Sequence, residues 1–286
     1  IVTEATVRVF RRPESFEVEA GLFPDWPSGV EATRRVLQRG IPLDLLRLSD
    51  EPETEVALTV GLGSGFLSKV VRTGLRLKGI RGSGCLLLVG AKGEAGDVER
   101  ALDRTRATAR SLGAVWLGRG PGRKWQKDRY RHPYLRDGLL DRGLATETLE
   151  TAAPWSKLDE LYDKVRTALR EGVGPGEKEV PVLCHLSHPY PDGASLYFTF
   201  FYRCPPDCDE AVARWADLKR RASRAIAEAG GAASHHHGVG RFHAPWLRSE
   251  VGDLGAESLA AVASRLDPRA LLNPGVLLDP ADRLEE

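Results

Sequence analysis

The segment Ser234-His235-His236-His237-Gly238-Val239-Gly240 places three adjacent imidazoles before two glycines. Histidine titrates near neutral pH, so such a cluster can transfer protons under cellular conditions. The glycines allow the backbone to approach a ligand closely. A surface loop is the alternative, whereas a purification tag is disfavoured because the triplet lies between two patterned helices. In an extended segment His235 and His237 point away from His236, so two of the three at most can face one site.

A metal site is a second use for these histidines, because His185, His188 and His243 also occur in the chain. No carboxylate accompanies them at a recognisable spacing. Cys204 and Cys208 form a C-x3-C pair without a second pair at zinc spacing, so a structural zinc is not expected. The residues alone leave a histidine metal site open but unsupported.

Tyr197 lies in a predicted strand in which the two faces differ. Leu196 and Phe198 point to one face, and Tyr197 and Thr199 point to the other. From the strand alone, packing in the core is the favoured role for the Tyr197 ring.

Two arginines stand among apolar residues, Arg47 within Leu45-Leu46-Arg47-Leu48 and Arg136 beside Tyr134-Leu135. A guanidinium in such surroundings needs an anionic partner. That partner is either a nearby carboxylate, which makes a structural salt bridge, or a substrate phosphate or carboxylate.

These residues need a sheet and helices to position them, and hydrophobic periodicity predicts both. Strands are predicted at 1–9, 15–23, 43–49, 85–90, 144–151, 180–187 and 195–203, and helices at 29–38, 98–112, 134–140, 156–169, 209–229 and 257–265. A basic loop is predicted at 118–127, and residues 61–84 show no clear pattern. Two runs of strand, helix, strand, strand and helix indicate a duplicated α+β layout, with helices packed on an antiparallel sheet.

The composition excludes several classes of protein. The chain has 286 residues, of which 42% are hydrophobic and 28% charged, as in a globular protein with a sizeable core. Its 41 Lys and Arg against 40 Asp and Glu give a formal charge of +1, which does not support nucleic-acid binding. No apolar run is long enough to span a membrane. The chain holds no methionine and opens within a strand pattern, so we expect it to be the C-terminal portion of a longer protein.

Seven short motifs follow one another along the chain. They are Ile1-Val-Thr-Glu-Ala-Thr6, Arg47-Leu-Ser-Asp50, Tyr134-Leu-Arg-Asp137, Glu150-Thr-Ala-Ala-Pro-Trp155, Leu196-Tyr-Phe198, the histidine segment and Leu272-Asn-Pro-Gly275. Together they resemble the C-terminal half of FAD-linked oxidases of the vanillyl-alcohol-oxidase type, and within that family most closely the alkyldihydroxyacetonephosphate synthase (alkylglycerone-phosphate synthase) group.

The resemblance implies a division of the chain into three parts. Residues 1–13 are then the last strand of an FAD-binding domain, residues 14–233 a cap or substrate domain, and residues 234–286 an active-site loop and helices that return to the FAD-binding domain. The loop that holds the FAD pyrophosphate lies upstream of this region in the family. We therefore expect this chain alone to bind FAD weakly.

The resemblance also implies roles for the residues singled out above. Tyr197 matches a catalytic tyrosine, and His235, His236 and His237 match a triplet that is needed for activity beside the flavin. Arg136 matches an arginine that holds the substrate phosphate, and Arg47 an arginine near the flavin and substrate. Contacts to the FAD cofactor are implied for Ile1, Val2, Arg47, His236 and Asn273.

The implied reaction exchanges the acyl group of acyl-dihydroxyacetone phosphate for a fatty alcohol and forms an ether-lipid precursor. The implied partners are that phosphorylated lipid, the fatty alcohol, a second copy of the chain and a membrane surface, with no nucleic acid. The Ala-, Arg- and Gly-rich composition indicates the cytoplasm of a bacterium.

Two alternatives stay open: an FAD-linked oxidase or dehydrogenase of a small hydroxy acid or alcohol, and a non-catalytic binding module on the cap fold. Hydroxyacid enzymes of this family carry a cap metal in motifs similar to H-x-G-D-G-N-x-H and S-G-E-H-G. Here Tyr197 and His236 replace a histidine and a glutamate ligand. The loss of the anionic ligand favours the synthase-like interpretation, and no cap metal is expected.

Overall fold

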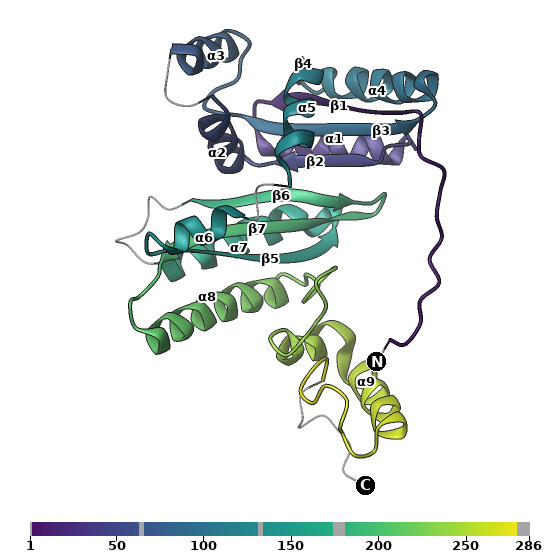
Figure 1. Ribbon diagram of the computed structural model, residues 1–286, viewed down its shortest axis with the longest axis vertical. Helices are drawn as coiled ribbons and strands as arrows, with labels where there is room; N and C mark the ends of the chain where they lie inside the picture. Colours follow the sequence, from purple (N-terminus) through teal and green to yellow (C-terminus); the bar gives the residue numbers. More distant parts are fainter. Residues whose placement is uncertain (1, 63–65, 131–133, 174–180, 279–286) are drawn as a thin grey trace.

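The computed structural model describes residues 2–62, 66–130, 134–173 and 181–278, and within these ranges the strands form one seven-stranded antiparallel sheet (Figure 1). In spatial order the strands are β4 (Val115–Gly118), β1 (Ser15–Phe23), β3 (Cys85–Gly93), β2 (Leu45–Ser49), β6 (Val182–Pro189), β7 (Gly193–Arg203) and β5 (Leu144–Pro154). The predicted α+β class, with helices packed on an antiparallel sheet, is confirmed.

Helices cover one face of this sheet and enclose the core. They are α1 (Trp26–Gln38), α4 (Ala95–Arg110), α7 (Leu158–Val173) and α8 (Cys208–Glu228). In α7 the apolar residues recur every three or four positions, as Leu158, Leu161, Val165 and Leu169, and all four are fully buried. Burial of each such side chain contributes about 1.5–3 kcal/mol to stability.

The two halves of the sheet share one topology. In the first half β1 pairs with β3 and β3 with β2, and in the second half β5 pairs with β7 and β7 with β6. The third strand of each half therefore lies between the first two. β2 and β6 join the halves, and Trp26 of α1 stacks on Tyr162 of α7 with ring centroids 4.8 Å apart. The predicted duplicated layout is present in the strand order.

The remaining helices lie at the edges and at one end. They are α2 (Glu51–Leu62), α3 (Phe66–Leu77), α5 (Arg119–Asp128), α6 (Leu135–Leu140), the 3-10 turn η2 (Trp155–Lys157) and α9 (Ala244–Leu266). Figure 1 shows α9 and the tail beyond α8 at one end of the molecule, with residues 2–14 running toward that same end. No helix within the described ranges is long and apolar enough to cross a membrane.

Two local predictions are wrong. Residues 2–14 form no strand and are exposed, because an alternating segment needs a neighbouring strand to bond and the described residues provide none there. Residues 118–127 were predicted to be a loop, but most of them belong to helix α5. Pro121 is compatible with this helix because it lies in the first turn, where the backbone N–H has no partner within the helix. Residues 61–84, which showed no pattern, include the end of α2 and all of α3.

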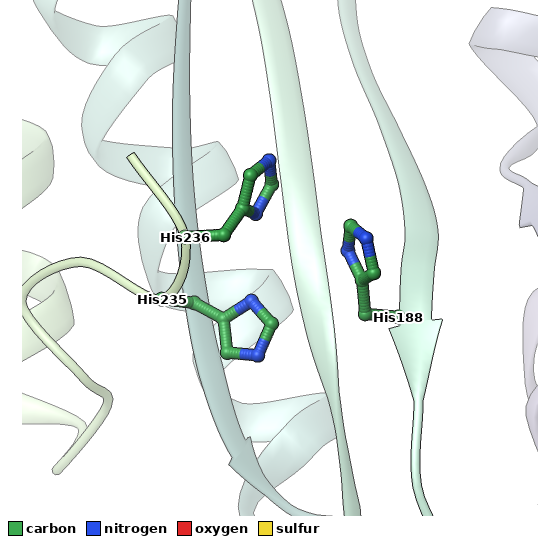
Figure 2. A group of neighbouring side chains, drawn as sticks. All are labelled: His188, His235 and His236. Carbon is green, nitrogen blue, oxygen red and sulfur yellow. The ribbon is translucent and has the colours of Figure 1, made fainter. Parts of the chain in front are cut away.

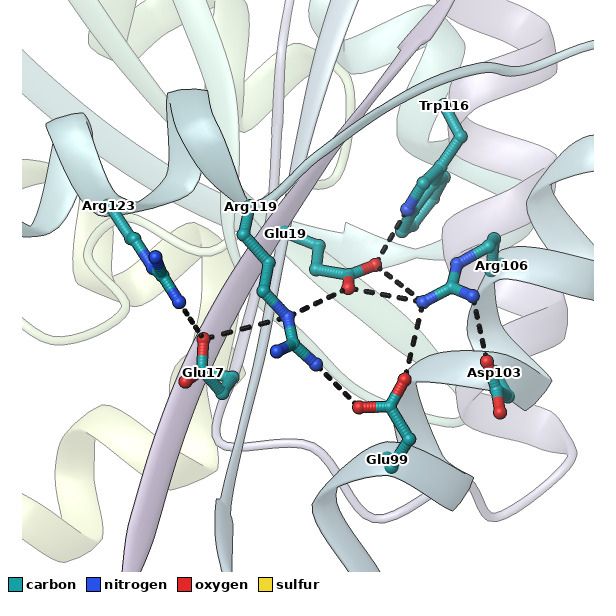
Figure 3. Close-up of polar contacts among 8 residues, drawn as sticks. All are labelled: Glu17, Glu19, Glu99, Asp103, Arg106, Trp116, Arg119 and Arg123. Atoms are coloured by element: carbon teal, nitrogen blue, oxygen red, sulfur yellow. Dashed lines mark hydrogen bonds and ion pairs between the residues drawn. The ribbon is translucent and has the colours of Figure 1, made fainter. Parts of the chain in front are cut away.

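A network of charged residues fastens the outer edge of the sheet (Figure 3). The buried Glu19 carboxylate on β1 accepts hydrogen bonds from Trp116 Nε1 (2.7 Å), Arg106 Nη2 (3.0 Å) and Arg119 Nε (3.3 Å). These donors come from β4, α4 and the start of α5. A buried carboxylate so fully paired joins three elements to β1 and serves the fold.

Candidate active site

Tyr197 lies on the face of the sheet opposite the helices. Leu196 and Phe198, its neighbours on β7, are fully buried in the helix-covered core. Cross-strand register places Tyr197 opposite His185 on β6 and opposite Glu150 on β5. Directly opposed residues share a face, so these three side chains form one row across three strands. The predicted alternation is confirmed, and core packing of Tyr197 is excluded.

The histidine triplet curls around the end of that row. The backbone N–H groups of His235, His236 and His237 all donate to Glu150 Oε1, the first at 2.8 Å and the last at 3.0 Å. Three consecutive donors can meet one oxygen only when the backbone is bent, so the segment is not extended and the limit that an extended segment would set does not apply. The ring of Tyr197 lies 6.5 Å from that of His236 and 5.6 Å from that of His237, between centroids.

Glu150 Oε1 accepts the three N–H groups, whereas Oε2 lies near two of the rings and makes no hydrogen bond with the described residues. Oε2 lies 2.6 Å from His236 Nδ1 and 3.4 Å from His235 Nδ1. Burial raises the pKa of the Glu150 carboxyl, but the N–H groups of the triplet and the nearby His236 outweigh that effect and lower it. Glu150 is therefore ionised at neutral pH.

The chain on either side of the triplet is also fixed. Ala232 N–H donates to the Ala152 carbonyl at 2.9 Å, and Thr151 Oγ1 donates to the Ala232 carbonyl at 2.7 Å. Beyond the triplet, Leu277 N–H donates to the Gly240 carbonyl at 3.1 Å. The segment before the triplet thus runs along β5, and the C-terminal tail returns to the exit of the loop.

Arg47 and His185 meet Glu53 of α2 beside the row. Arg47 Nη2 lies 2.6 Å from Glu53 Oε1, and His185 Nδ1 lies 3.1 Å from the same oxygen. Burial alone raises the pKa of Glu53, but His185 and the Arg47 guanidinium outweigh it, so the pKa is lowered. Burial lowers the pKa of His185, whose ring stacks on that of Tyr197 with 4.9 Å between the centroids. The structural salt bridge that the sequence left open for Arg47 is present.

His188 on β6 completes a group of three imidazoles with His235 and His236 (Figure 2). The ring centroids of His188 and His236 are 4.7 Å apart, and the nitrogen atoms of the three rings come close enough together to hold a metal ion. Burial and the two neighbouring imidazoles lower the pKa of His188. Glu150 with His236 and His237 forms a second such group. The expectation of no metal stays a prediction.

The structure does not unite every predicted residue with this site. Arg136 is exposed in α6, and no contact between it and the triplet occurs in the described ranges. Asn273 lies in the tail with a φ of 46°, and its carbonyl accepts a hydrogen bond from the N–H of Val276. Val2 is 84% exposed, and Ile1 lies outside the described residues.

Two functional candidates were not singled out by sequence reasoning, namely Glu150 and Glu53, whereas His188 was named there only as a possible metal ligand. Glu150 stood in a quoted motif at the end of a predicted strand, and the structure places it within β5. Nothing in the sequence pairs it with the triplet, which lies 85 positions further along.

The chain matches a family model described as FAD linked oxidases, C-terminal domain, over residues 12–277. Alkyldihydroxyacetonephosphate synthase of Trypanosoma brucei brucei is 30% identical over 288 residues, which cover 97% of this chain and 46% of that protein. The probable mitochondrial D-lactate dehydrogenase of Danio rerio is 25% identical, with coverage of 98% and 51%. A solved alkyldihydroxyacetonephosphate synthase has the same fold, with a TM-score of 0.69 at 23% identity, covering 92% of this chain and 45% of that one. The chain spans about half the length of these relatives.

Proposed function

The chain belongs to the family of FAD-linked oxidases, through their C-terminal domain, and from this premise we propose that it supplies the substrate face of a flavoenzyme similar to alkyldihydroxyacetonephosphate synthase. The proposed reaction exchanges the acyl group of acyl-dihydroxyacetone phosphate for a fatty alcohol. The observation that carries the proposal is the shared face of Tyr197 and the histidine triplet.

The residues of this face fit the cofactor for which the family is named. Arg47 Nε, His235 Nδ1 and Ser234 Oγ are buried without a hydrogen-bond partner among the described residues. Buried polar atoms need partners, and a flavin ring offers heteroatoms along its edge. FAD is therefore the cofactor that this chain serves, and Arg47, His235 and His236 are the groups that would hold its ring. When bound, FAD supplies electron-accepting chemistry at the substrate carbon.

The chain's own residues supply proton transfer. The Tyr197 hydroxyl can give or take a proton at a substrate oxygen or carbon, and the imidazoles of His236 and His237 stand beside it to exchange that proton. The His185 ring stacks on the Tyr197 ring and holds its orientation.

The test is an exchange assay on the FAD-loaded protein, with acyl-dihydroxyacetone phosphate and a labelled fatty alcohol. Label should enter an ether product with release of fatty acid. In parallel, D-lactate and other small 2-hydroxy acids are offered with an artificial electron acceptor. Turnover of a hydroxy acid without ether formation would contradict the synthase proposal.

An oxidoreductase acting on a small hydroxy acid is the second candidate. His188 with His235 and His236 favours it, since a metal held there would bind a hydroxy-acid substrate, and a D-lactate dehydrogenase is among the relatives. The same parallel assay separates the two candidates, and added zinc or manganese should stimulate only the second.

Arg136 is proposed to bind the substrate phosphate. Its side chain is exposed on α6, and α6 contacts β5. In the FAD-loaded protein Arg136→Ala should raise KM for the phosphorylated substrate by roughly tenfold or more, through loss of a bidentate anion contact. An unphosphorylated analogue should be affected far less, and equal effects on both would point to a role in folding.

Because the proposed substrates are lipids, we also propose that the protein contacts a membrane surface, and separately that it works as a homodimer in a bacterial cytoplasm. Sedimentation with phospholipid vesicles tests the membrane contact, and light scattering tests the homodimer. Protein that stays in the supernatant, or scatters as a monomer, contradicts the corresponding proposal.

A further inference from the structure

Glu53 brings a carboxylate from helix α2 to the side of the row that contains His185 and Tyr197. Its side chain is only 16% exposed. Glu53 Oε1 accepts a hydrogen bond from Arg47 Nη2 at 2.6 Å and lies 3.1 Å from His185 Nδ1. Arg47 Nη2 and His185 Nδ1 are themselves 3.1 Å apart. Because Arg47 lies on β2 and His185 on β6, one carboxylate oxygen joins two strands of the sheet to α2.

The start of α2 fixes the backbone from which this carboxylate extends. Asp50 N–H donates to the Cys184 carbonyl of β6 at 2.8 Å, and Asp50 Oδ1 accepts the Glu53 N–H at 2.9 Å. One residue further, Thr54 Oγ1 accepts the Leu86 N–H of β3 at 3.0 Å. The first turn of α2 is thus bonded to two strands. The fold therefore places Glu53, and the side chains that contact it take their positions from it.

The contact holds the His185 ring in either tautomer. An ionised carboxylate can only accept and a guanidinium can only donate. His185 Nδ1 therefore bonds to Glu53 when it carries the hydrogen, and to Arg47 when it does not. The His185 ring stacks on the Tyr197 ring with 4.9 Å between the centroids and 20° between the planes. The orientation of His185 therefore restricts that of Tyr197.

The same oxygen orients the guanidinium of Arg47. Nη2 is held by Glu53, whereas Nε is buried without a hydrogen-bond partner in the described part of the chain. A guanidinium is planar, so fixing one nitrogen restricts the direction in which the Nε–H bond points. Arg47 thus keeps one donor available for a ligand while another is tied to α2.

We propose that Glu53 is a positioning residue, which holds Arg47 for the flavin ring and, through His185, holds Tyr197 for proton transfer. Its part in turnover rests on the proposed function, whereas the orientation of Tyr197 does not. The alternative is an ion pair that serves only the packing of α2 against the sheet.

Two substitutions separate the reach of the side chain from its charge. Glu53→Gln keeps the length and one acceptor oxygen but loses the charge, whereas Glu53→Asp keeps the charge and is one methylene shorter. Positioning depends on reach. Proton–carbon NMR of the Tyr197 ring, assigned by its absence in Tyr197→Phe, should therefore stay close to native in Glu53→Gln. In Glu53→Asp it should move toward the signal of the exposed Tyr134.

Riboflavin binding measures the effect on Arg47. A fluorescence titration should give a Kd about tenfold higher in Glu53→Asp, because a charged donor is turned away from the ring, and within about threefold of native in Glu53→Gln. A native chain that binds no riboflavin, or equal Kd values in the two variants, overturns the part of the proposal that concerns Arg47.

Glu55→Asp is the matched control, because Glu55 lies on the same helix and pairs with Arg72 at 2.6 Å. It shortens an ion pair of α2 in the same way, so the Tyr197 signal and riboflavin binding should not change. A Tyr197 signal that moves in both Asp variants, in neither, or in Glu53→Gln as much as in Glu53→Asp overturns the proposal. If Glu53→Asp does not fold under conditions in which Glu55→Asp does, Glu53 serves packing, and the proposal is overturned as well.

Activity distinguishes this proposal from the proposed function. In FAD-loaded protein Glu53→Asp should lower kcat by about tenfold or more with a smaller change in KM, since the proton-transfer group is displaced, and Glu53→Gln should retain most of the native kcat. If native protein lacks the exchange activity while the Tyr197 signal behaves as expected, the proposed function fails and the positioning role stands. An unchanged kcat for Glu53→Asp in an active enzyme overturns the role in turnover.

Discussion

At the scale of single residues, the phenol of Tyr197 is the group whose chemistry can be removed most cleanly. Tyr197→Phe deletes one hydroxyl from a half-buried ring that keeps its stacking on His185, so thermal unfolding should change little. Turnover of FAD-loaded protein should fall on the order of 10²-fold if the hydroxyl moves a proton. Thr199→Val, two residues along on the same face, is the control. Full activity in Tyr197→Phe would exclude the proton-transfer role.

A second residue, Asp50, makes stability depend on pH. It precedes α2, where its Oδ1 accepts Glu53 N–H at 2.9 Å and its Oδ2 accepts the Tyr162 hydroxyl at 3.0 Å. Burial raises the pKa of Asp50 from 3.8 to about 7. Between these two values the unfolded chain binds fewer protons than the folded chain, so the contribution of Asp50 to stability is lost as pH rises from about 4 to about 7.

Asp50→Asn should remove this part of the pH dependence. The difference in unfolding free energy between Asp50→Asn and the native protein should shift in favour of Asn, by on the order of 4 kcal/mol at most, as pH is raised over that range. Urea unfolding at several pH values measures it. Glu53 and Glu150 have lowered pKa values and so change stability with pH in the opposite direction, but both proteins contain them and their contributions cancel when the variant is compared with the native protein. If the difference in unfolding free energy between the two proteins does not vary with pH, the raised pKa of Asp50 is contradicted.

At the scale of elements, α5 can pack closely against β1 because Gly122 has no side chain. A Cβ on Gly122 would overlap the Val18 carbonyl of β1, whereas a Cβ on Gly120 in the same helix would meet nothing within 4 Å. Gly122→Ala should therefore destabilise the protein by about 1–3 kcal/mol through overpacking. Gly120→Ala should be neutral or stabilise by about 0.5–1 kcal/mol through helix propensity. Urea unfolding of both variants measures this, and equal effects would show that α5 does not press on β1.

Elements with strong periodicity were predictable, and those that depend on distant partners were not. β1 and β7 alternate clearly, and the stripe of α7 is regular, so all three were expected from sequence. β4 spans only four residues, too few to show a period. In the site, alternation put Tyr197 on the correct face, but the bend of the triplet depends on a carboxylate from another strand.

At the scale of the whole molecule, the described chain presents groups for a flavin ring more clearly than for the rest of FAD. Arg47, His235 and His236 are the groups that would hold the ring of a bound flavin. We therefore predict weak binding of FAD to the isolated chain, with riboflavin bound within about threefold of FAD, because both share the ring. Fluorescence titration with each ligand measures it. Protein that purifies with stoichiometric yellow flavin would contradict weak binding, and a large preference for FAD would reveal contacts to its diphosphate or adenosine.

The repeated strand order of the two halves has a bearing on ancestry. The strand order is the one expected if one unit was copied within a gene and the two copies then diverged. By cross-strand register, Arg47, Leu88 and Ala20 form one row across β2, β3 and β1 in the first half, as His185, Tyr197 and Glu150 do across β6, β7 and β5 in the second. Leu88 and Ala20 are buried and apolar, so the first copy retains only one charged group in that row. The chemistry of the reaction constrains the row in the second half, whereas only packing volume constrains the row in the first. Leu88 can therefore be replaced during evolution by an apolar residue of similar size, but Tyr197 and Glu150 cannot.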